Sequence, residues 1–97
     1  MKQLTSSEEK DNYTAKMTRS LPVLRATLGI TQQELGRLVG VTRQTIAAVE
    51  NWRRPLTWTL YLAIAYVMEQ DPRTNNMMRF LQVSAESDEP ESGVSSS

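Results

Sequence analysis

The segment 31–51, TQQELGRLVGVTRQTIAAVEN, constrains the fold of this chain more than any other feature of its sequence. It holds two short stretches with apolar residues at helical spacing. Each stretch begins with a threonine that can cap a helix, Thr31 and Thr42, and Glu34 completes a capping box with Thr31. The short link at Gly40 leaves room for a turn of about three to four residues. We therefore expect two helices that are joined by a tight turn and set near right angles.

Two helices that cross at such an angle approach closely, so the first needs a small residue at the crossing point. Gly36 supplies it, directly after the expected core position Leu35. Three aliphatic residues are placed to hold the second helix against the first: Val41, Ile46 and Val49. The opposite face of the second helix begins with Arg43 and Gln44, long hydrogen-bonding side chains that have no reason to be buried.

Helical patterns continue on both sides of this pair. Before it, Ser20 can cap a helix that holds Pro22 in its first turn and ends at Gly29. After it, Thr57 can open a fourth helix, and a fifth is expected to run from about residue 74 to residue 83. No segment alternates with a period of two between turns. The predicted fold class is therefore all-α, with five short helices and a sixth if the N-terminal segment is helical.

Apolar residues at helical spacing predict which positions face the core. In the three helices from residue 31 to residue 67 they are Leu35, Leu38, Val39, Ile46, Val49, Leu60, Ala63, Ile64 and Val67. The fifth helix would carry four apolar residues, Met77, Met78, Phe80 and Leu81.

The two ends of the chain differ from its middle in composition. Residues 1–16 are polar, and residues 84–97 contain Ser, Glu, Asp, Pro and Gly with almost nothing apolar. A segment of that second kind cannot bury enough surface to fold alone. We therefore predict a polar N-terminal extension (1–16), which is either unstructured or a short helix, a helical domain (17–83), and a disordered acidic tail (84–97).

Charge is unevenly distributed, although the whole chain has a net charge of zero. Residues 17–83 contain eight arginines against four carboxylates, a net charge of +4. The last fourteen residues carry four carboxylates and no base, a net charge of −4. The basic middle could meet phosphates. An ordinary solvated face is the alternative explanation of such a pattern.

The stretch from about Leu21 to Val67 resembles the Cro and phage-repressor class of helix-turn-helix DNA-binding domains, also called the XRE family. The resemblance is carried by a spaced set of residues: an arginine in the first helix, Thr-Gln opening the second, a small residue after Leu35, Gly40 at the turn, and Glu-Asn closing the third. It covers about half of the chain and implies a helix-turn-helix bundle like that of the lambda repressor.

In that family the first residues of the third helix enter the major groove and contact base edges. The resemblance assigns this role to Arg43 and Gln44, with Ala48 one turn further along. Arginine can pair with guanine and glutamine with adenine through two hydrogen bonds, each pair adding about 1–3 kcal/mol of discrimination. Ala48 could contact a thymine methyl group. Without the motif, Arg43 and Gln44 would be read as solvated side chains at an exposed helix start.

Further residues are expected to contact the DNA backbone. The resemblance places Gln32 on a phosphate together with the start of its helix, where the helix dipole favours an anion. Thr42 is chiefly a cap and is expected to add a phosphate contact with Thr45. The family places more backbone contacts after the third helix, here at Asn51, Arg53 and Arg54. The alternative for Gln32 is an ordinary polar residue at a helix start. The alternative for Arg53 and Arg54 is a solvated loop.

The resemblance also assigns a structural pair and marks one departure. An arginine of the first helix and the glutamate closing the third pair with each other in the family, and Arg25 and Glu50 match those positions. The family commonly has glycine after Glu-Asn, where this chain has Trp52. We expect Asn51 to take the left-handed conformation instead, and Trp52 and Trp58 to pack beneath the loop and the fourth helix.

One such domain covers only half of a recognition site, so the resemblance implies a homodimer on a two-fold operator in double-stranded DNA. Residues 77–81 form an apolar cluster that could contribute to the dimer interface, with Tyr61 or Tyr66 joining it. Closure of the core by the same cluster is the alternative.

The predicted function is a cytoplasmic, sequence-specific transcription regulator, most often a repressor by occlusion in this class. The alternative is an antitoxin-like or adaptor protein whose main partner is another protein. An enzyme is not expected, because the chain has no histidine, no cysteine and no glycine-rich phosphate loop. No metal, cofactor or catalytic residue is predicted. The sequence contains no run of 18 apolar residues, so no membrane partner is predicted either.

Overall fold

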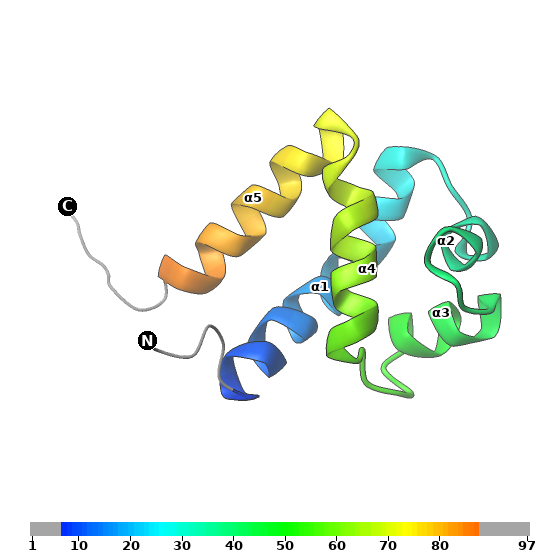
Figure 1. Cartoon of the computed structure of the whole chain (residues 1–97), viewed down its shortest axis with the longest axis horizontal. Coiled ribbons are helices and arrows are strands. Elements are labelled where there is room, and N and C mark those ends of the chain that lie inside the picture. Colours follow the sequence, from blue (N-terminus) through cyan, green and yellow to red (C-terminus); the bar gives the residue numbers. More distant parts are fainter. Residues whose placement is uncertain (1–6, 88–97) are drawn as a thin grey trace.

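The computed structural model describes residues 7–87 of the 97-residue chain, with side chains up to residue 80. These residues form five α-helices, and no strand occurs among them (Figure 1). The helices are α1 (Ser7–Leu28), α2 (Gln32–Val39), α3 (Arg43–Glu50), α4 (Trp58–Glu69) and α5 (Pro72–Ser87). The predicted all-α fold class is confirmed.

The first helix is longer than the sequence predicted. The helix start expected at Ser20 is wrong, because α1 begins at Ser7 and continues through Pro22. Met17, Leu21 and Leu24 lie on one buried face at the spacing of a continuous helix. Proline inside a helix removes one backbone hydrogen bond, and the burial of this face on both sides of Pro22 offsets that loss. Residues 1–6 lie outside the described part of the chain.

Three threonines begin helices as predicted. Thr31 and Glu34 form a reciprocal capping box, in which Glu34 N donates to Thr31 Oγ1 (3.0 Å) and Thr31 N donates to Glu34 Oε1 (2.8 Å). Thr42 Oγ1 accepts a bond of 3.2 Å from the backbone of α3, and Thr57 Oγ1 accepts one of 3.2 Å from the backbone of α4. These caps satisfy backbone donors that the first turn of each helix leaves free.

The last helix begins earlier and ends later than predicted. Arg73 N donates to Asp71 Oδ1 at 2.9 Å, so Asp71 caps a helix whose first residue is Pro72. Proline suits that position because its missing N–H would have no partner there. The helix continues to Ser87, so the first four residues of the predicted disordered tail are helical. Residues 88–97 lie outside the described residues.

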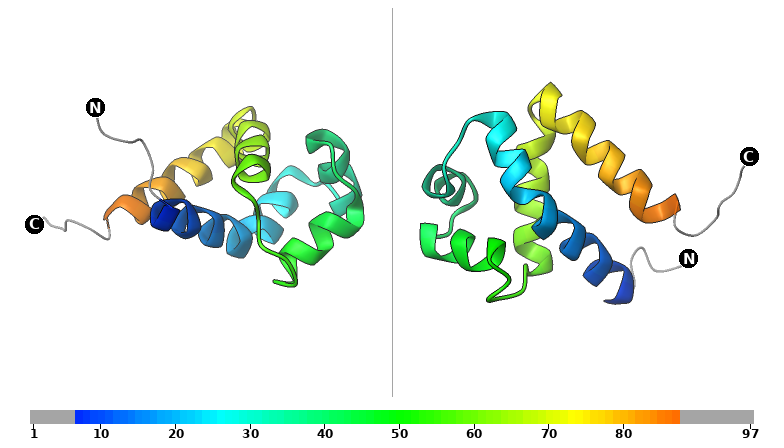
Figure 2. Two further views of the ribbon diagram at one scale, coloured as in Figure 1. Left: turned by 60° about the horizontal axis from the view of Figure 1, so that its bottom comes forward. Right: turned by 180° about the vertical axis from the view of Figure 1, so that it is seen from behind.

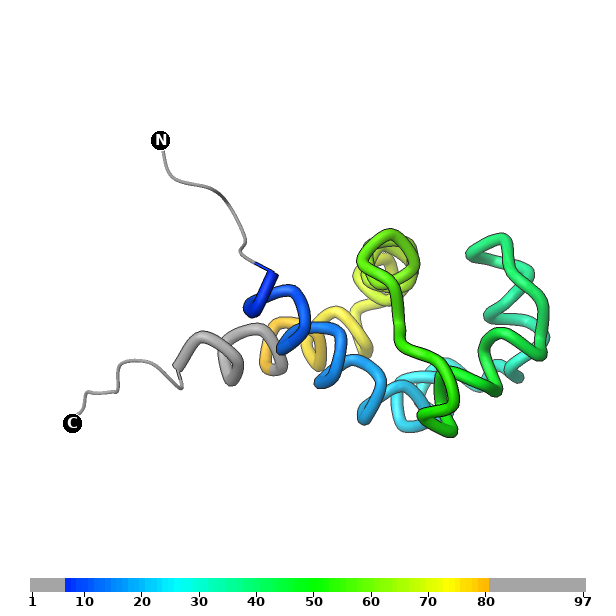
Figure 3. The backbone as a smooth tube through the Cα atoms, turned by 90° about the horizontal axis from the view of Figure 1, so that it is seen from below, coloured from blue at the N-terminus to red at the C-terminus, as the bar shows by residue number. Residues whose placement is uncertain are grey.

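The core lies where α1, α4 and α5 meet, with α2 and α3 closing one end. Both views of Figure 2 place α2 and α3 together at the end away from α5, and Figure 3 shows α4 along its axis beside them. The buried hydrophobic residues are Met17, Leu21, Leu24, Leu35, Ile46, Val49, Leu56, Tyr61, Ile64, Ala65, Met68 and Met78.

Several predicted core positions are wrong. Leu38 is 59% exposed, although it was expected to face the core. Phe80, which was expected either to contribute to a dimer interface or to close the core, is 71% exposed. In α4 Ile64 is buried as predicted, and Tyr61, Ala65 and Met68 are buried with it. The other predicted positions of this helix, Leu60, Ala63 and Val67, are only half-buried. This helix is apolar on nearly every side, so its sequence period does not distinguish an inner face. No helix in residues 7–87 has the length and apolar character needed to cross a membrane.

Candidate nucleic-acid interface

The turn between α2 and α3 is built on two glycines. A Cβ atom placed on Gly36 would lie 2.6 Å from the carbonyl oxygen of Val41, which is backbone and cannot move aside easily. Gly40 has φ +84°, and the N–H groups of Gly40 and Val41 both donate to Gly36 O at 2.8 Å. The close approach predicted at Gly36 is confirmed, and it lets α3 cross tightly beside α2.

The start of α3 projects its side chains outward. Arg43 and Gln44 are exposed in the first turn, while Ile46 and Val49 on the opposite face are buried. Thr42 and Thr45, which precede and complete that turn, share a hydrogen bond of 3.1 Å between their hydroxyl oxygens. The first turn of α3 therefore presents a polar face to solvent, while the opposite face of the helix is held in the core. Ala48, one turn further along, is half-buried.

An ion pair anchors the other end of α3 to α1. Arg25 Nε donates to Glu50 Oε2 at 2.7 Å, and Arg25 Nη2 donates to Glu50 Oε1 at 3.0 Å. The hydrogen bonds to Glu50 raise the pKa of the Arg25 guanidinium above its ordinary value. Arg25 Nη1 also donates to Ile30 O at 3.2 Å. The pair predicted from the resemblance is confirmed, and it holds α1, the following loop and α3 in one arrangement.

Gln32 joins the same network, which the sequence did not predict. Its side-chain Nε2 donates to Glu50 Oε1 at 2.9 Å, and the residue is half-buried at the start of α2. The side-chain amide nitrogen of glutamine carries two N–H groups that can donate. One N–H group of Gln32 donates to Glu50, so the second is left for the expected phosphate contact.

Helix α3 ends with a tryptophan in the left-handed conformation. Trp52 has φ +62°, whereas Asn51 has φ −92°, so the expectation that Asn51 would take this role is wrong. Trp52 N donates to Val49 O (3.0 Å) and Arg53 N donates to Ala48 O (2.8 Å). These two bonds form a Schellman motif, which usually has glycine at the left-handed position. The chain therefore keeps the geometry for which glycine is the favoured residue.

The two tryptophans have different surroundings. Trp58 is half-buried, its ring stacks on Tyr61 with centroids 4.8 Å apart, and Lys10 lies 5.5 Å from the centre of the Trp58 ring. The packing role predicted for Trp58 is confirmed. Trp52 is 59% exposed, so the same prediction is wrong for Trp52.

The residues after α3 are open to solvent. Asn51, Arg53 and Arg54 are all exposed, and neither arginine side chain makes a hydrogen bond or ion pair with the described residues. The structure thus brings eight of the nine predicted contact residues onto α3, its cap and the loop that follows it. Gln32 lies beside them at the start of α2.

Comparisons with known proteins point to the same segment. The helix-turn-helix family model matches residues 24–61. An uncharacterised HTH-type transcriptional regulator of Bacillus subtilis (strain 168), YgzD, is 53% identical over 34 residues, which is 35% of this chain and 52% of the relative. The chain therefore spans about half the length of that relative. No solved structure matches the chain.

Proposed function

We propose that the chain is a sequence-specific transcription regulator that reads double-stranded DNA through residues 24–61, the segment that the helix-turn-helix family model matches. The observation that carries this proposal is the asymmetry of α3. One face of the helix is fixed in the core by Ile46 and Val49, while Arg43 and Gln44 project freely from its first turn. An α-helix presented in this way fits the major groove.

The exposed side chains have the chemistry of base readers. Arg43 can donate two hydrogen bonds to guanine O6 and N7, and Gln44 can bond adenine N6 and N7. Ala48 lies one turn along the helix and would contact a thymine methyl group or leave room for a base. Together these positions read successive base pairs of one half-site.

Backbone contacts set the register of α3 without specifying sequence. We assign them to polar residues at both ends of the helix-turn-helix unit: Gln32, Thr42, Thr45, Asn51, Arg53 and Arg54. Such contacts make binding strongly dependent on salt, because each neutralised phosphate releases counterions.

The domain acts as a homodimer on a two-fold operator in this proposal. An apolar groove of about 380 Å³ runs between α1 and α5, and Val23 (57% exposed) and Phe80 (71% exposed) lie along it. A second copy of the chain would cover these side chains. Tyr66 is 66% exposed and can join such an interface, whereas Tyr61 is 6% exposed and belongs to the core.

Occupying an operator blocks other proteins from it, so repression in the cytoplasm is the proposed outcome. The domain division, with an N-terminal extension (1–16), a DNA-binding part (17–83) and an acidic tail (84–97), remains part of the proposal. Within it, residues 7–16 continue into α1 rather than forming a separate helix.

Selection of duplexes from a random pool tests the function directly. The full chain is incubated with the pool at moderate salt, and bound duplexes are amplified and sequenced. An enriched motif with two-fold symmetry is the expected result. Binding that is blind to sequence, or no binding, would contradict the proposal and direct attention to the alternative of a protein-binding adaptor or antitoxin-like protein.

A further inference from the structure

Most of the arginines with no partner in the described structure lie on one part of the fold. Arg25 and Arg73 form ion pairs, and Arg79 donates to Asn75. The side chains of the other arginines make no hydrogen bond or ion pair with described residues: Arg19, Arg37, Arg43, Arg53 and Arg54. All of these except Arg19 belong to α2, α3 or the loop after α3. Of these four arginines, Arg37 is the one to which the function proposed above gives no role.

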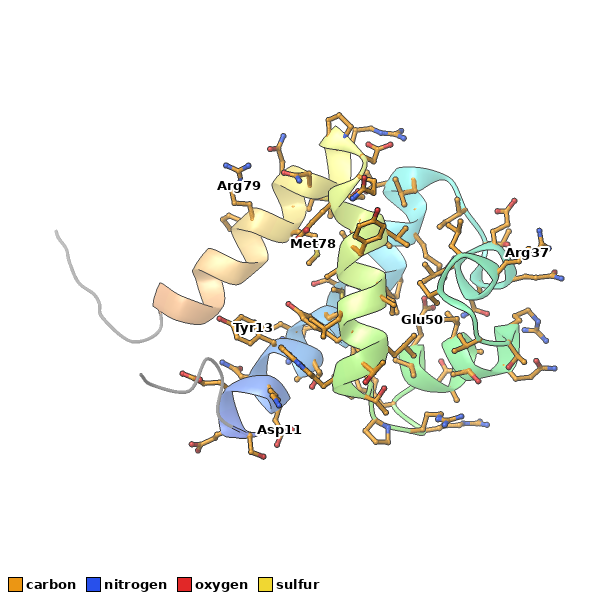
Figure 4. All side chains as sticks on the ribbon, in the orientation of Figure 1. Asp11, Tyr13, Arg37, Glu50, Met78 and Arg79 are labelled. Carbon is orange, nitrogen blue, oxygen red and sulfur yellow. The ribbon has the colours of Figure 1, made fainter. Side chains whose placement is uncertain are left out.

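Arg37 lies beside the start of α3. It belongs to the last turn of α2, and Figure 4 shows its side chain on the outer side of that helix, pointing away from the bundle. An open hollow of about 390 Å³ separates it from the first turn of α3. The residues that line the hollow are Gln33, Arg37, Val41, Thr42, Arg43 and Gln44. Two arginines from different helices therefore border one hollow.

Among the side chains that the structure describes, no carboxylate pairs with Arg37 or Arg43. The acidic residue of α2, Glu34, accepts a bond of 2.8 Å from Thr31 N and does not line the hollow. The acidic residue of α3, Glu50, is paired with Arg25 at the other end of that helix. The hollow is thus a positively charged surface next to the proposed base readers, and it suits an anion.

We infer that Arg37 binds a phosphate of the DNA backbone beside the base pairs that Arg43 and Gln44 read. This inference rests on the proposed function. When α3 lies in the major groove, α2 crosses above the backbone, so the outer side of α2 faces phosphates rather than bases. The planar guanidinium matches phosphate oxygens through two parallel hydrogen bonds. Unpaired arginines then flank α3 at both ends, with Arg37 beside its start and Arg53 and Arg54 after its end.

A phosphate contact has a signature that base reading lacks. It adds about 0.9 to the slope of log affinity against log salt concentration, and it strengthens binding to all sequences by the same factor. Removing Arg37 should therefore weaken binding and flatten its salt dependence, without changing which sequences are preferred.

The test uses the full chain and a labelled duplex that carries the motif enriched by the wild-type chain. Dissociation constants are measured by fluorescence anisotropy over a series of KCl concentrations for the wild type, Arg37→Ala and Arg37→Lys. Arg79→Ala is the matched control: it removes the same charge from α5, on the opposite side of the molecule from Arg37 (Figure 4). Thermal unfolding checks that each variant remains folded.

We expect Arg37→Ala to lower the slope by about 0.9 for each protomer bound, with the same enriched motif as the wild type. Arg37→Lys should keep most of the slope, because the charge remains, and Arg79→Ala should match the wild type. A slope for Arg37→Ala equal to that of Arg79→Ala would overturn the inference while leaving the proposed function intact. So would a changed motif, because it would make Arg37 a base reader. If the wild-type chain enriches no duplex, the proposed function fails first and this inference with it.

Discussion

The guanidinium of Arg25 and the carboxylate of Glu50 face each other across two hydrogen bonds of 2.7 and 3.0 Å. This pair joins the last turn of α1 to the last residue of α3, and Gln32 ties the start of α2 to the same carboxylate. The side chain of Arg25 is 19% exposed and that of Glu50 is 6% exposed. The orientation of the proposed recognition helix therefore depends on a partly buried ionic network.

Substituting either partner of this pair should destabilise the fold. Arg25→Ala leaves the Glu50 carboxylate nearly buried without its cation, and Glu50→Ala leaves the guanidinium without its anion. Each change should lower the free energy of unfolding by roughly 3 kcal/mol. The double variant should lose clearly less than the sum of the two single losses, because neither charge is then left alone. Urea denaturation of the four proteins measures this coupling, and additive losses would show that the pair contributes nothing as a unit.

Gly36→Ala should also destabilise the domain, although alanine favours a helix more than glycine. The gain in helix propensity is about 1 kcal/mol. The added Cβ would lie 2.6 Å from Val41 O, so the turn or α3 must shift. Overpacking of this kind costs typically 1–3 kcal/mol, so we expect a net loss of about 1 kcal/mol. Gln33→Ala on the exposed side of the same helix is the control, with a change within about 0.5 kcal/mol. A more stable Gly36→Ala protein would refute the close approach.

Trp52→Gly should be more stable than Trp52→Ala. Both substitutions remove the indole ring, but only glycine adopts φ near +62° without a steric penalty. The left-handed conformation costs other residues roughly 1–2 kcal/mol. The expected difference between the two variants in thermal or urea unfolding is therefore about 1 kcal/mol in favour of glycine. Equal stabilities would mean that the end of α3 does not hold residue 52 in this conformation.

The carboxyl of Asp71 should titrate at low pH. Its hydrogen bonds from the Arg73 side chain and the Arg73 backbone N–H lower the pKa of Asp71 from its ordinary value of 3.8 to about 2. Because the folded-state pKa is lowered, the stabilisation that Asp71 gives α5 is present above pH 4 and is lost as the pH falls toward 2.

NMR titration of the Asp71 carboxyl carbon checks this expectation. Arg73→Ala removes the larger, side-chain contribution and keeps the backbone bond, so the pKa of Asp71 should rise but stay below 3.8. A wild-type titration midpoint near 3.8 would contradict the capping geometry.

The features that the sequence predicted correctly are mainly local. The caps at Thr31, Thr42 and Thr57 depend on residues within one helical turn, so their spacing is enough to identify them. Gly36 was identifiable because a tight turn follows it four residues later. The pairing of Arg25 with Glu50, which are 25 residues apart, came from the family resemblance and not from local pattern.

The features that the sequence missed depend on tertiary packing. Ser20 and Pro22 carry a helix-start signal, but burial of Met17 and Leu21 on one face keeps α1 continuous. The bond from Gln32 to Glu50 and the position of Arg37 beside Arg43 require knowledge of how α2 and α3 cross. Trp52 in the left-handed conformation contradicts residue preference, because the backbone bonds that end α3 determine its φ.

The most direct test of the central claim compares the sequences selected by the wild type, Arg43→Ala, Gln44→Ala and the control Arg79→Ala from one random duplex pool. If the start of α3 reads bases, Arg43→Ala should lose preference at one position of each half-site, Gln44→Ala should lose it at a neighbouring position, and Arg79→Ala should retain the wild-type motif. Each loss should amount to about 1–3 kcal/mol of discrimination. An unchanged motif in both α3 variants would contradict the assignment of base reading to this helix.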